Sequence, residues 1–237
     1  MSILKVHSIE SFSTLDGPGI RYVIFLQGCS FRCHYCHNID TRAFDQGKEL
    51  SHSDIIWEVR RNAGYLKANS GGITASGGEP LEQAESLVPL FREVKGLSLT
   101  TCLDTAGYIL NNSVKKLLDV TDLVLLDYKH TDEEKHKILT GRSNRVVKEF
   151  HRYLEESGKN YWIRYTILQG INDSEDDISG LKEILDKCHY LKKIDVLPYH
   201  TLGVHKWREL NMDYPLGDMK PFDPKRAREI QDFLSPW

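Results

Sequence analysis

Short apolar stretches alternate along the chain with longer segments in which apolar residues recur every three or four positions. This alternation is typical of strands followed by helices in an α/β fold with a mainly parallel sheet. Strands are predicted over 21–27, 72–75, 99–103, 123–126, 161–167 and 193–197. Helices are predicted over 51–65, 80–95, 113–118, 132–139, 145–156, 175–187 and 223–234. Six strands are too few for a closed eight-stranded barrel, so we expect an open, partial barrel forming a single domain over residues 1–237.

Polar and small residues follow most of these predicted strands. They are Gly28 and Cys29, then Gly77 to Glu79, Asp104 and Thr105, Asp127 and Lys129, and Tyr199 and His200. In parallel α/β folds the functional site lies at the carboxyl ends of the strands. The sequence therefore predicts one pocket lined from five strand ends.

Three cysteines, Cys29, Cys33 and Cys36, stand close together in the loop after the first predicted strand. Their C-x3-C-x2-C spacing favours a compact metal centre, and iron–sulfur cubanes take thiolate ligands. Three local ligands would leave one iron open to another molecule. A closed zinc site completed by His34 or His37 is the alternative, since structural zinc is tetrahedral. Three unligated thiols are the least favoured interpretation, because exposed clustered thiols oxidise.

The two other cysteines, Cys102 and Cys188, stand alone in the sequence and are typical of small buried apolar residues.

The composition of the chain mainly excludes classes of protein. With 40% hydrophobic and 27% charged residues and a net charge of −3, the chain is expected to be globular and to bind neither nucleic acid nor membrane. Residues 1–10 lack the apolar core of a signal peptide, so a cytoplasmic location is expected.

The Gly77-Gly78-Glu79-Pro80 segment follows the second predicted strand. It does not fit a phosphate loop, because Gly78-Glu79 stands where Lys-Ser/Thr is required. Taken alone it is equally typical of a tight turn, although its exposed backbone could accept hydrogen bonds from an ammonium group. The carboxylates of Asp104 and Asp127 would need a cation if they converge, either Lys129 or a bound monovalent ion.

The cysteine spacing, with Tyr35 just before the third cysteine, resembles the signature of the radical S-adenosylmethionine superfamily, and the Gly-Gly-Glu segment resembles its second motif. This resemblance implies a partial (β/α)6 barrel of the TIM type. It also implies one [4Fe–4S] cluster whose open iron binds S-adenosylmethionine. In this superfamily a reduced cluster cleaves that molecule to methionine and a 5′-deoxyadenosyl radical, which abstracts hydrogen.

The segment 16–21, Asp-Gly-Pro-Gly-Ile-Arg, resembles the signature of the activating enzymes of glycyl radical enzymes. Further matches are 101–105, 124–129, 162–165, 197–200 and 205–207. The implied activity is that of an oxidoreductase which generates a glycyl radical on pyruvate formate-lyase under anaerobic conditions. A flavodoxin or ferredoxin as electron donor and a monomeric state are also implied. Residues 38–71 contain no cysteine, which fits an activating enzyme with a single cluster.

The same resemblance implies roles for individual residues. Cys29, Cys33 and Cys36 would hold the cluster; Tyr35, Cys36, His37, Gly77, Gly78, Glu79, Asp127, Tyr128, Lys129 and His200 would line the S-adenosylmethionine site; Asp104, Thr105, Leu125 and Asp127 would form a monovalent-cation site; and Asp16 and Arg164 would face the partner's glycine loop. A turn-forming role for Asp16 and a surface ion pair for Arg164 are the competing interpretations.

Three other functions remain open from the sequence. The partner could be another glycyl radical enzyme, or the radical could act on a small molecule. A zinc-stabilised binding module, closed by the three cysteines and a histidine, is the alternative from a different class.

Overall fold

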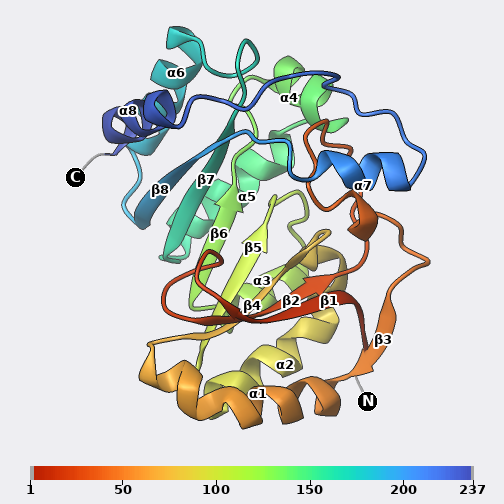
Figure 1. Ribbon diagram of the computed structural model, residues 1–237. Helices are drawn as coiled ribbons and strands as arrows, with labels where there is room; N and C mark the ends of the chain where they lie inside the picture. The colour runs from red at the N-terminus through yellow and green to blue at the C-terminus, as the bar shows by residue number, and fades with distance from the viewer. Residues whose placement is uncertain (1–2, 236–237) are drawn as a thin grey trace. The chain divides into compact units, whose positions relative to one another are not determined.

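The computed structural model of the chain describes residues 3–235 (Figure 1). Its strands are β1 (Ile3–Ser13), β2 (Arg21–Leu26), β3 (Lys48–Ser51), β4 (Gly72–Gly77), β5 (Thr100–Thr105), β6 (Leu123–Asp127), β7 (Tyr161–Ile167) and β8 (Leu191–Pro198). Its α-helices are α1 (His52–Ala68), α2 (Ala84–Gly96), α3 (Asn112–Asp119), α4 (Glu133–Thr140), α5 (Arg145–Glu156), α6 (Glu175–Leu185), α7 (Val204–Glu209) and α8 (Pro224–Leu234). Two short 3₁₀ helices are η1 (Ile39–Thr41) and η2 (Pro80–Gln83).

The strands form an open sheet with the order β3-β1-β2-β4-β5-β6-β7-β8. β2 pairs in parallel with β4, β4 with β5, and β7 with β8. β1 runs antiparallel to both β2 and β3. All six predicted strands are present within a few residues of their expected bounds, and the expected mainly parallel sheet is confirmed.

The sheet has two further strands, β1 and β3, that were not predicted from the sequence. β1 buries only Leu4 and Val6 deeply, and its remaining residues are exposed or half-buried, so its apolar alternation is too short to stand out. β3 is four residues long and has no fully buried residue. Both pair antiparallel at the β2 side of the order, outside the repeating strand–helix pattern on which the prediction depended.

The predicted helices also need two corrections. The segment expected as one helix over 80–95 divides into η2 and α2, because Glu79 caps a separate 3₁₀ turn beginning at Pro80. α7 was not predicted, since it spans six residues and buries only Trp207. The expected start of α1 is confirmed: the Ser51 hydroxyl accepts a hydrogen bond from the backbone N–H of Asp54.

The chain divides into two compact units. Unit 1 comprises Met1–Ser30, Thr41–Thr105 and Ile109–Leu125. Its parallel strands are buried almost throughout, and α2 packs an apolar face formed by Leu87, Leu90, Phe91 and Val94 into the core of the unit. Continuous burial of this kind is what a parallel strand covered on both faces requires.

Unit 2 comprises Phe31–Asp40, Ala106–Tyr108 and Leu126–Trp237. Alternate residues of β7 are fully buried, namely Tyr161, Ile163, Tyr165 and Ile167. α5 contributes Val147, Phe150 and Leu154 to the same core. A single domain over residues 1–237 stays a prediction. Within residues 3–235, no helix combines the length and the apolar character needed to cross a bilayer.

Candidate active site

The start of the cysteine loop is hydrogen-bonded to the Gly-Gly-Glu segment in unit 1. The parallel register sets Leu26 opposite Gly77, so β2 and β4 end side by side. The Gly78 N–H donates to the Leu26 carbonyl at 2.9 Å, and the Glu79 N–H donates to the Gly28 carbonyl at 2.8 Å. Gly78 is required here for space, because a Cβ atom at this position would lie 2.4 Å from the Gly28 carbonyl oxygen.

The Glu79 side chain is almost fully buried and holds the turn together from within. Its Oε1 accepts a hydrogen bond from the Leu81 N–H at 3.1 Å and another from the Thr105 hydroxyl at 2.5 Å. The carboxylate therefore caps η2 and ties the end of β4 to the end of β5. Because the carboxylate is engaged within the turn, only the backbone of this segment is left to contact the cofactor. That contact stays a prediction.

Two more predicted residues lie at the strand ends of unit 1. The Ser76 hydroxyl donates to Asp104 Oδ2 at 2.7 Å, which joins β4 to β5 a second time. Asp16 accepts a hydrogen bond from the Ser13 hydroxyl at 2.5 Å, which is the turn-forming role considered for it from the sequence. Its backbone carbonyl also accepts from the Thr74 hydroxyl at 2.7 Å.

Arg21 was quoted in the sequence motif without a role, and unit 1 supplies one. Its side chain is 0% exposed. The guanidinium donates to the hydroxyl groups of Thr74 at 3.0 Å and Thr100 at 2.6 Å, and also to the backbone carbonyls of Ile73, Thr100 and Pro18. Because Thr74 also holds Asp16, this buried cation fixes the Asp-Gly-Pro-Gly loop. The sequence signal that could have revealed this role is a charged residue at the first position of a buried strand.

In unit 2 the rest of the cysteine loop runs along the end of α4. The Arg32 N–H donates to the Thr140 carbonyl at 2.7 Å, and the His34 N–H donates to the Leu139 carbonyl at 3.0 Å. The Cys36 N–H donates to the Cys33 carbonyl at 3.3 Å in a tight turn between the two thiols. The loop backbone is therefore fixed on both sides of Cys33.

α7 holds the same loop from its other end. Trp207 Nε1 donates to the Cys36 carbonyl at 2.9 Å, and Lys206 forms an ion pair with Asp40 at 2.9 Å. Gly203 packs against His37, since a Cβ atom on this glycine would lie 2.7 Å from the His37 Cα. The segment 205–207 was noted in the sequence, but its contact with the cysteine loop was not foreseen.

The structure brings the predicted residues His37 and His200 together. Their rings stack with centroids 4.2 Å apart, and His37 Nε2 lies 3.0 Å from the His200 backbone carbonyl. Burial lowers the pKa of His37, and the ammonium groups of Lys129 and Lys206 lower it further. His37 is therefore a neutral, half-buried imidazole at pH 7.

A second group in unit 2 centres on Asp127 at the end of β6. Lys129 Nζ lies 2.5 Å from Asp127 Oδ2, and Arg164 Nε lies 3.9 Å from Oδ1. Burial alone would raise the pKa of Asp127, but Lys129 and Arg164 hold it below its usual range. Lys129 and Arg164 thus both lie beside the Asp127 carboxylate, while the predicted cation site at Asp127 and the predicted partner contact of Arg164 stay predictions.

Lys129 also lies beside the cysteine loop. Its ammonium group is 5.4 Å from the centroid of the buried Tyr35 ring. Burial acts to lower the pKa of Lys129, but Asp127, Tyr35 and Cys33 together hold it well above its usual value. Lys129 is therefore held between the carboxylate of Asp127 and the cysteine loop.

The remaining predicted residues fall as follows. Cys29, Gly77, Gly78, Asp104, Thr105 and Leu125 belong to unit 1, whereas Cys33, Tyr35, Cys36, Asp127, Tyr128 and Lys129 belong to unit 2. The three cysteines lie within eight residues of one another along the chain. Their ligand roles, the cofactor contacts and the cation site stay predictions.

Comparison with known proteins identifies the family. Residues 15–148 match the family model described as a 4Fe-4S single cluster domain. The chain is 43% identical over 240 residues to the pyruvate formate-lyase 1-activating enzyme of Escherichia coli K12, covering 100% of this chain and 98% of that protein. It is 40% identical over 230 residues to the pyruvate formate-lyase-activating enzyme of Clostridium pasteurianum, covering 97% and 96% of the two chains. The chain belongs to the family of pyruvate formate-lyase-activating enzymes.

The fold agrees with that membership. A radical SAM methyltransferase from Sphaerobacter thermophilus superposes with a TM-score of 0.62 at 16% identity, over 98% of this chain and 74% of that structure. At this identity the likeness shows the fold alone. The expected partial barrel of the radical S-adenosylmethionine type and the expected family are both confirmed.

Proposed function

We propose that this chain activates pyruvate formate-lyase by generating a glycyl radical on it. The observation that supports this function is full-length identity of about 40% to enzymes named for that activity, together with the three cysteines of the predicted cluster loop. When bound, one [4Fe–4S] cluster and S-adenosylmethionine supply the electron and the 5′-deoxyadenosyl radical that removes an α-hydrogen from a glycine of the partner.

The residues of the loop fit such a cluster. Cys29, Cys33 and Cys36 offer three thiol ligands in eight residues, and thiolates are the ligands that iron–sulfur clusters take. The loop backbone is fixed by hydrogen bonds near each thiol, at Gly28, His34 and Cys36. A loop held in this way positions its ligands without having to order them when the cluster binds.

The S-adenosylmethionine contacts are proposed for the same residues as in the sequence analysis. The backbone of Gly77 and Gly78 would accept from the amino group, since the Glu79 carboxylate is already engaged within its turn. His37 and His200 offer a stacked pair of imidazole rings suited to a sugar or base. Tyr35, Tyr128, Asp127 and Lys129 complete the set, with the Asp127–Lys129 ion pair supplying balanced charge.

The cation and partner sites extend the proposal. Asp104, Thr105, Leu125 and Asp127 would hold a monovalent cation through carboxylate, hydroxyl and carbonyl oxygens. Asp16 and Arg164 would receive the partner's glycine loop. A flavodoxin or ferredoxin would supply the electron, and the enzyme would work as a monomer in the cytoplasm.

Anaerobic reconstitution tests this function. The chain is loaded with iron and sulfide, reduced, and mixed with S-adenosylmethionine and pyruvate formate-lyase. We expect 5′-deoxyadenosine and a glycyl signal in electron paramagnetic resonance. Cys33→Ala should lose both, together with the cluster absorbance. Cys102→Ala is the matched control, because burial raises the pKa of the Cys102 thiol to about 11 and keeps it a small apolar group.

Two outcomes would reject the proposal. Cleavage of S-adenosylmethionine without a glycyl signal would point to a small-molecule substrate. A colourless, iron-poor preparation with one zinc in the cysteine loop would favour the zinc-stabilised module instead.

A further inference from the structure

Three segments of unit 2 that meet at the cysteine loop carry positive charge. Residues 31–37, 106–108 and 140–148 contain four arginine and lysine side chains and no aspartate or glutamate, although the whole chain has a net charge of −3. One of the four, Arg145, forms an ion pair with Glu133. The other three, Arg32, Arg142 and Lys148, are exposed. Together with the half-buried Tyr108 they form what we term the basic face.

Printed contacts bring the two arginines of the basic face together. The rings of Phe31 and Tyr108 stack with centroids 4.3 Å apart, and the Arg142 guanidinium carbon lies 6.0 Å from the Tyr108 centroid. Gly141 ends α4 in a left-handed conformation, with a φ of +76°. A Cβ atom at this glycine would lie 3.2 Å from the Arg32 Cβ. Arg32 therefore packs beside the residue that directly precedes Arg142.

Lys148 belongs to the same region on electrostatic grounds. His136 on α4 is fully buried, and its ring centroid lies 5.7 Å from that of Phe31. Burial lowers the pKa of His136, and the ammonium groups of Lys129 and Lys148 lower it further. The imidazole is therefore neutral at pH 7, and the positive field of Lys148 reaches the side chains directly beneath the face.

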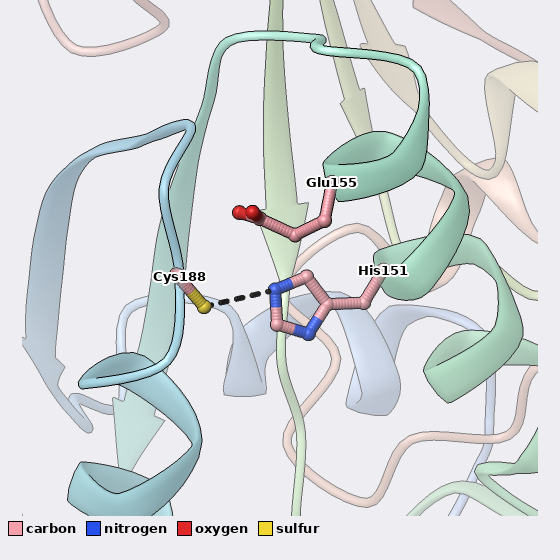
Figure 2. A group of neighbouring side chains, drawn as sticks. All are labelled: His151, Glu155 and Cys188. Atoms are coloured by element: carbon pink, nitrogen blue, oxygen red, sulfur yellow. Dashed lines mark hydrogen bonds between the residues drawn. The ribbon is translucent and has the colours of Figure 1, made fainter.

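The helix that carries Lys148 is anchored by other residues on it. His151 and Glu155 on α5 converge with Cys188 (Figure 2). The Tyr161 hydroxyl lies 2.7 Å from His151 Nε2 and donates to Glu155 Oε1 at 2.6 Å. This phenol fills the space between the three side chains and leaves no room for an ion there. The resulting hydrogen-bond network ties α5 to β7, so Lys148 stands on a fixed helix.

The position of the basic face indicates which kind of protein docks there. Arg32 directly precedes Cys33, so a protein bound at the face lies against the loop predicted to hold the cluster. Electron-carrier proteins form small, transient interfaces, and their encounters are guided by complementary charge. Arginine is also suited to carboxylates, which it binds through two parallel hydrogen bonds. A carrier with acidic residues around its redox group therefore fits this surface.

We propose that the basic face docks an acidic one-electron carrier protein that reduces the cluster. The inference rests on the proposed function, and it adds the place where the electron enters and the charge that the carrier presents. The reduced carrier loses one electron and the cluster gains it, and no bond forms or breaks. Arg32, Arg142 and Lys148 attract the carrier and orient its acidic surface toward the cysteine loop.

The rate of cluster reduction tests the basic face. The anaerobic, cluster-loaded chain is mixed with reduced flavodoxin, and the reduced cluster is measured by rapid-freeze electron paramagnetic resonance. We expect the initial rate to fall with rising ionic strength, because salt screens the attraction between charges. The double variant Arg142→Gln with Lys148→Gln should react about tenfold more slowly at low salt and depend less on salt. Photoreduced deazariboflavin, a small uncharged reductant, should reduce both proteins equally fast.

The matched control removes the same two charges elsewhere in unit 2. Arg228→Gln with Lys225→Gln changes two exposed side chains of α8 and should react with flavodoxin like the wild type. Equal losses in the two double variants would show an effect of overall charge and overturn the basic face. An unchanged rate for Arg142→Gln with Lys148→Gln, or an equal loss with deazariboflavin, would overturn it as well.

The experiment separates the basic face from the proposed function. Neither S-adenosylmethionine nor pyruvate formate-lyase is present, so a cluster that forms but is reduced equally fast in all variants rejects only the docking surface. A chain that takes up no cluster would reject the proposed function and the docking surface together. Unchanged cluster reduction with slower glycyl-radical formation would assign the face to pyruvate formate-lyase instead of an electron carrier.

Discussion

The backbone N–H of Glu79 donates to the carbonyl of Gly28, directly before the first cysteine, at 2.8 Å. This bond joins the two sequence motifs that identify the superfamily, although they lie some fifty residues apart. The adjacent bond, from the Gly78 N–H to the Leu26 carbonyl, continues the same pairing. The glycines of the Gly-Gly-Glu segment therefore have a structural role: they allow this turn to pack closely against the start of the cysteine loop.

Gly78→Ala should disrupt that approach. The new methyl group would lie 2.4 Å from the Gly28 carbonyl oxygen, which is backbone and cannot swing aside. We expect the free energy of unfolding to fall by about 1–3 kcal/mol, the usual effect of overpacking. Iron incorporation should fall as well. Both are measured by denaturant titration and by iron analysis after anaerobic reconstitution.

Gly64→Ala is the matched control for this change. Gly64 lies within α1, and a Cβ atom there would have no neighbour within 4 Å. Alanine in a helix is better than glycine by roughly 0.5–1 kcal/mol, so this variant should be slightly more stable than the wild type. Equal effects of the two substitutions would contradict the role assigned to Gly78.

Sequence patterns predicted some elements almost to the residue. The strand over 161–167 and the helix over 145–156 coincide with β7 and α5. Both have a strong amphipathic or alternating pattern, because each buries one face completely. β1 was not predicted because only two of its residues, Leu4 and Val6, are deeply buried, which is too few to give a recognisable alternating pattern.

The candidate site was predictable only as far as motifs extend. The cysteines, the Gly-Gly-Glu segment and Asp127 are recognisable from residue type and spacing. Trp207 and Gly203 are not, because their contacts with Cys36 and His37 cross more than 160 residues of sequence. The Glu79 carboxylate illustrates a different limit: the resemblance placed Glu79 in the cofactor site, which stays a prediction, and its capping hydrogen bonds were not predicted.

Arg21→Lys should destabilise unit 1. A lysine cannot reproduce a guanidinium that donates to Thr74, Thr100 and three backbone carbonyls, and unpaired acceptors would remain buried. We expect a loss of about 2–3 kcal/mol in the free energy of unfolding. Arg60→Lys is the comparison, because the Arg60 side chain is mostly exposed and its ion pair with Glu93 is on the surface. A loss below about 0.5 kcal/mol for Arg21→Lys would show that the network is dispensable.

Trp207→Phe should loosen the cysteine loop at Cys36. The variant removes the indole N–H that binds the Cys36 carbonyl at 2.9 Å, at a cost of about 1 kcal/mol. We expect the reconstituted cluster to bleach faster in air, followed by absorbance. Trp57→Phe on α1 should behave as wild type, because that side chain is largely exposed. Identical bleaching rates in the two variants would show that the Trp207 hydrogen bond does not stabilise the cluster loop.

Lys129→Met should leave Asp127 as a poorly compensated, mostly buried carboxylate, with only Arg164 nearby. We expect the free energy of unfolding at pH 7 to fall by about 3 kcal/mol. The double variant Lys129→Met with Asp127→Asn should recover more than half of this loss, because the poorly compensated carboxylate is no longer present. Lys193→Met, which breaks an exposed ion pair with Asp195, should change stability by less than about 0.5 kcal/mol.

The pH dependence supplies a further test of the Asp127–Lys129 pair. In the wild type the pKa of Asp127 is depressed, so its stabilising effect is present above its unfolded-state pKa of about 4 and is lost as the pH falls through the lower folded value. The pKa of Lys129 is raised, so its contribution persists until the pH exceeds its unfolded value of about 10.4.

Removal of the lysine lets burial raise the Asp127 pKa, which favours the neutral acid. The stability deficit of Lys129→Met should therefore be largest at neutral pH and shrink below about pH 4, as measured by urea unfolding. A deficit that stays constant from pH 7 to pH 3 would mean that packing of the lysine stem, and not its charge, is what stabilises the end of β6.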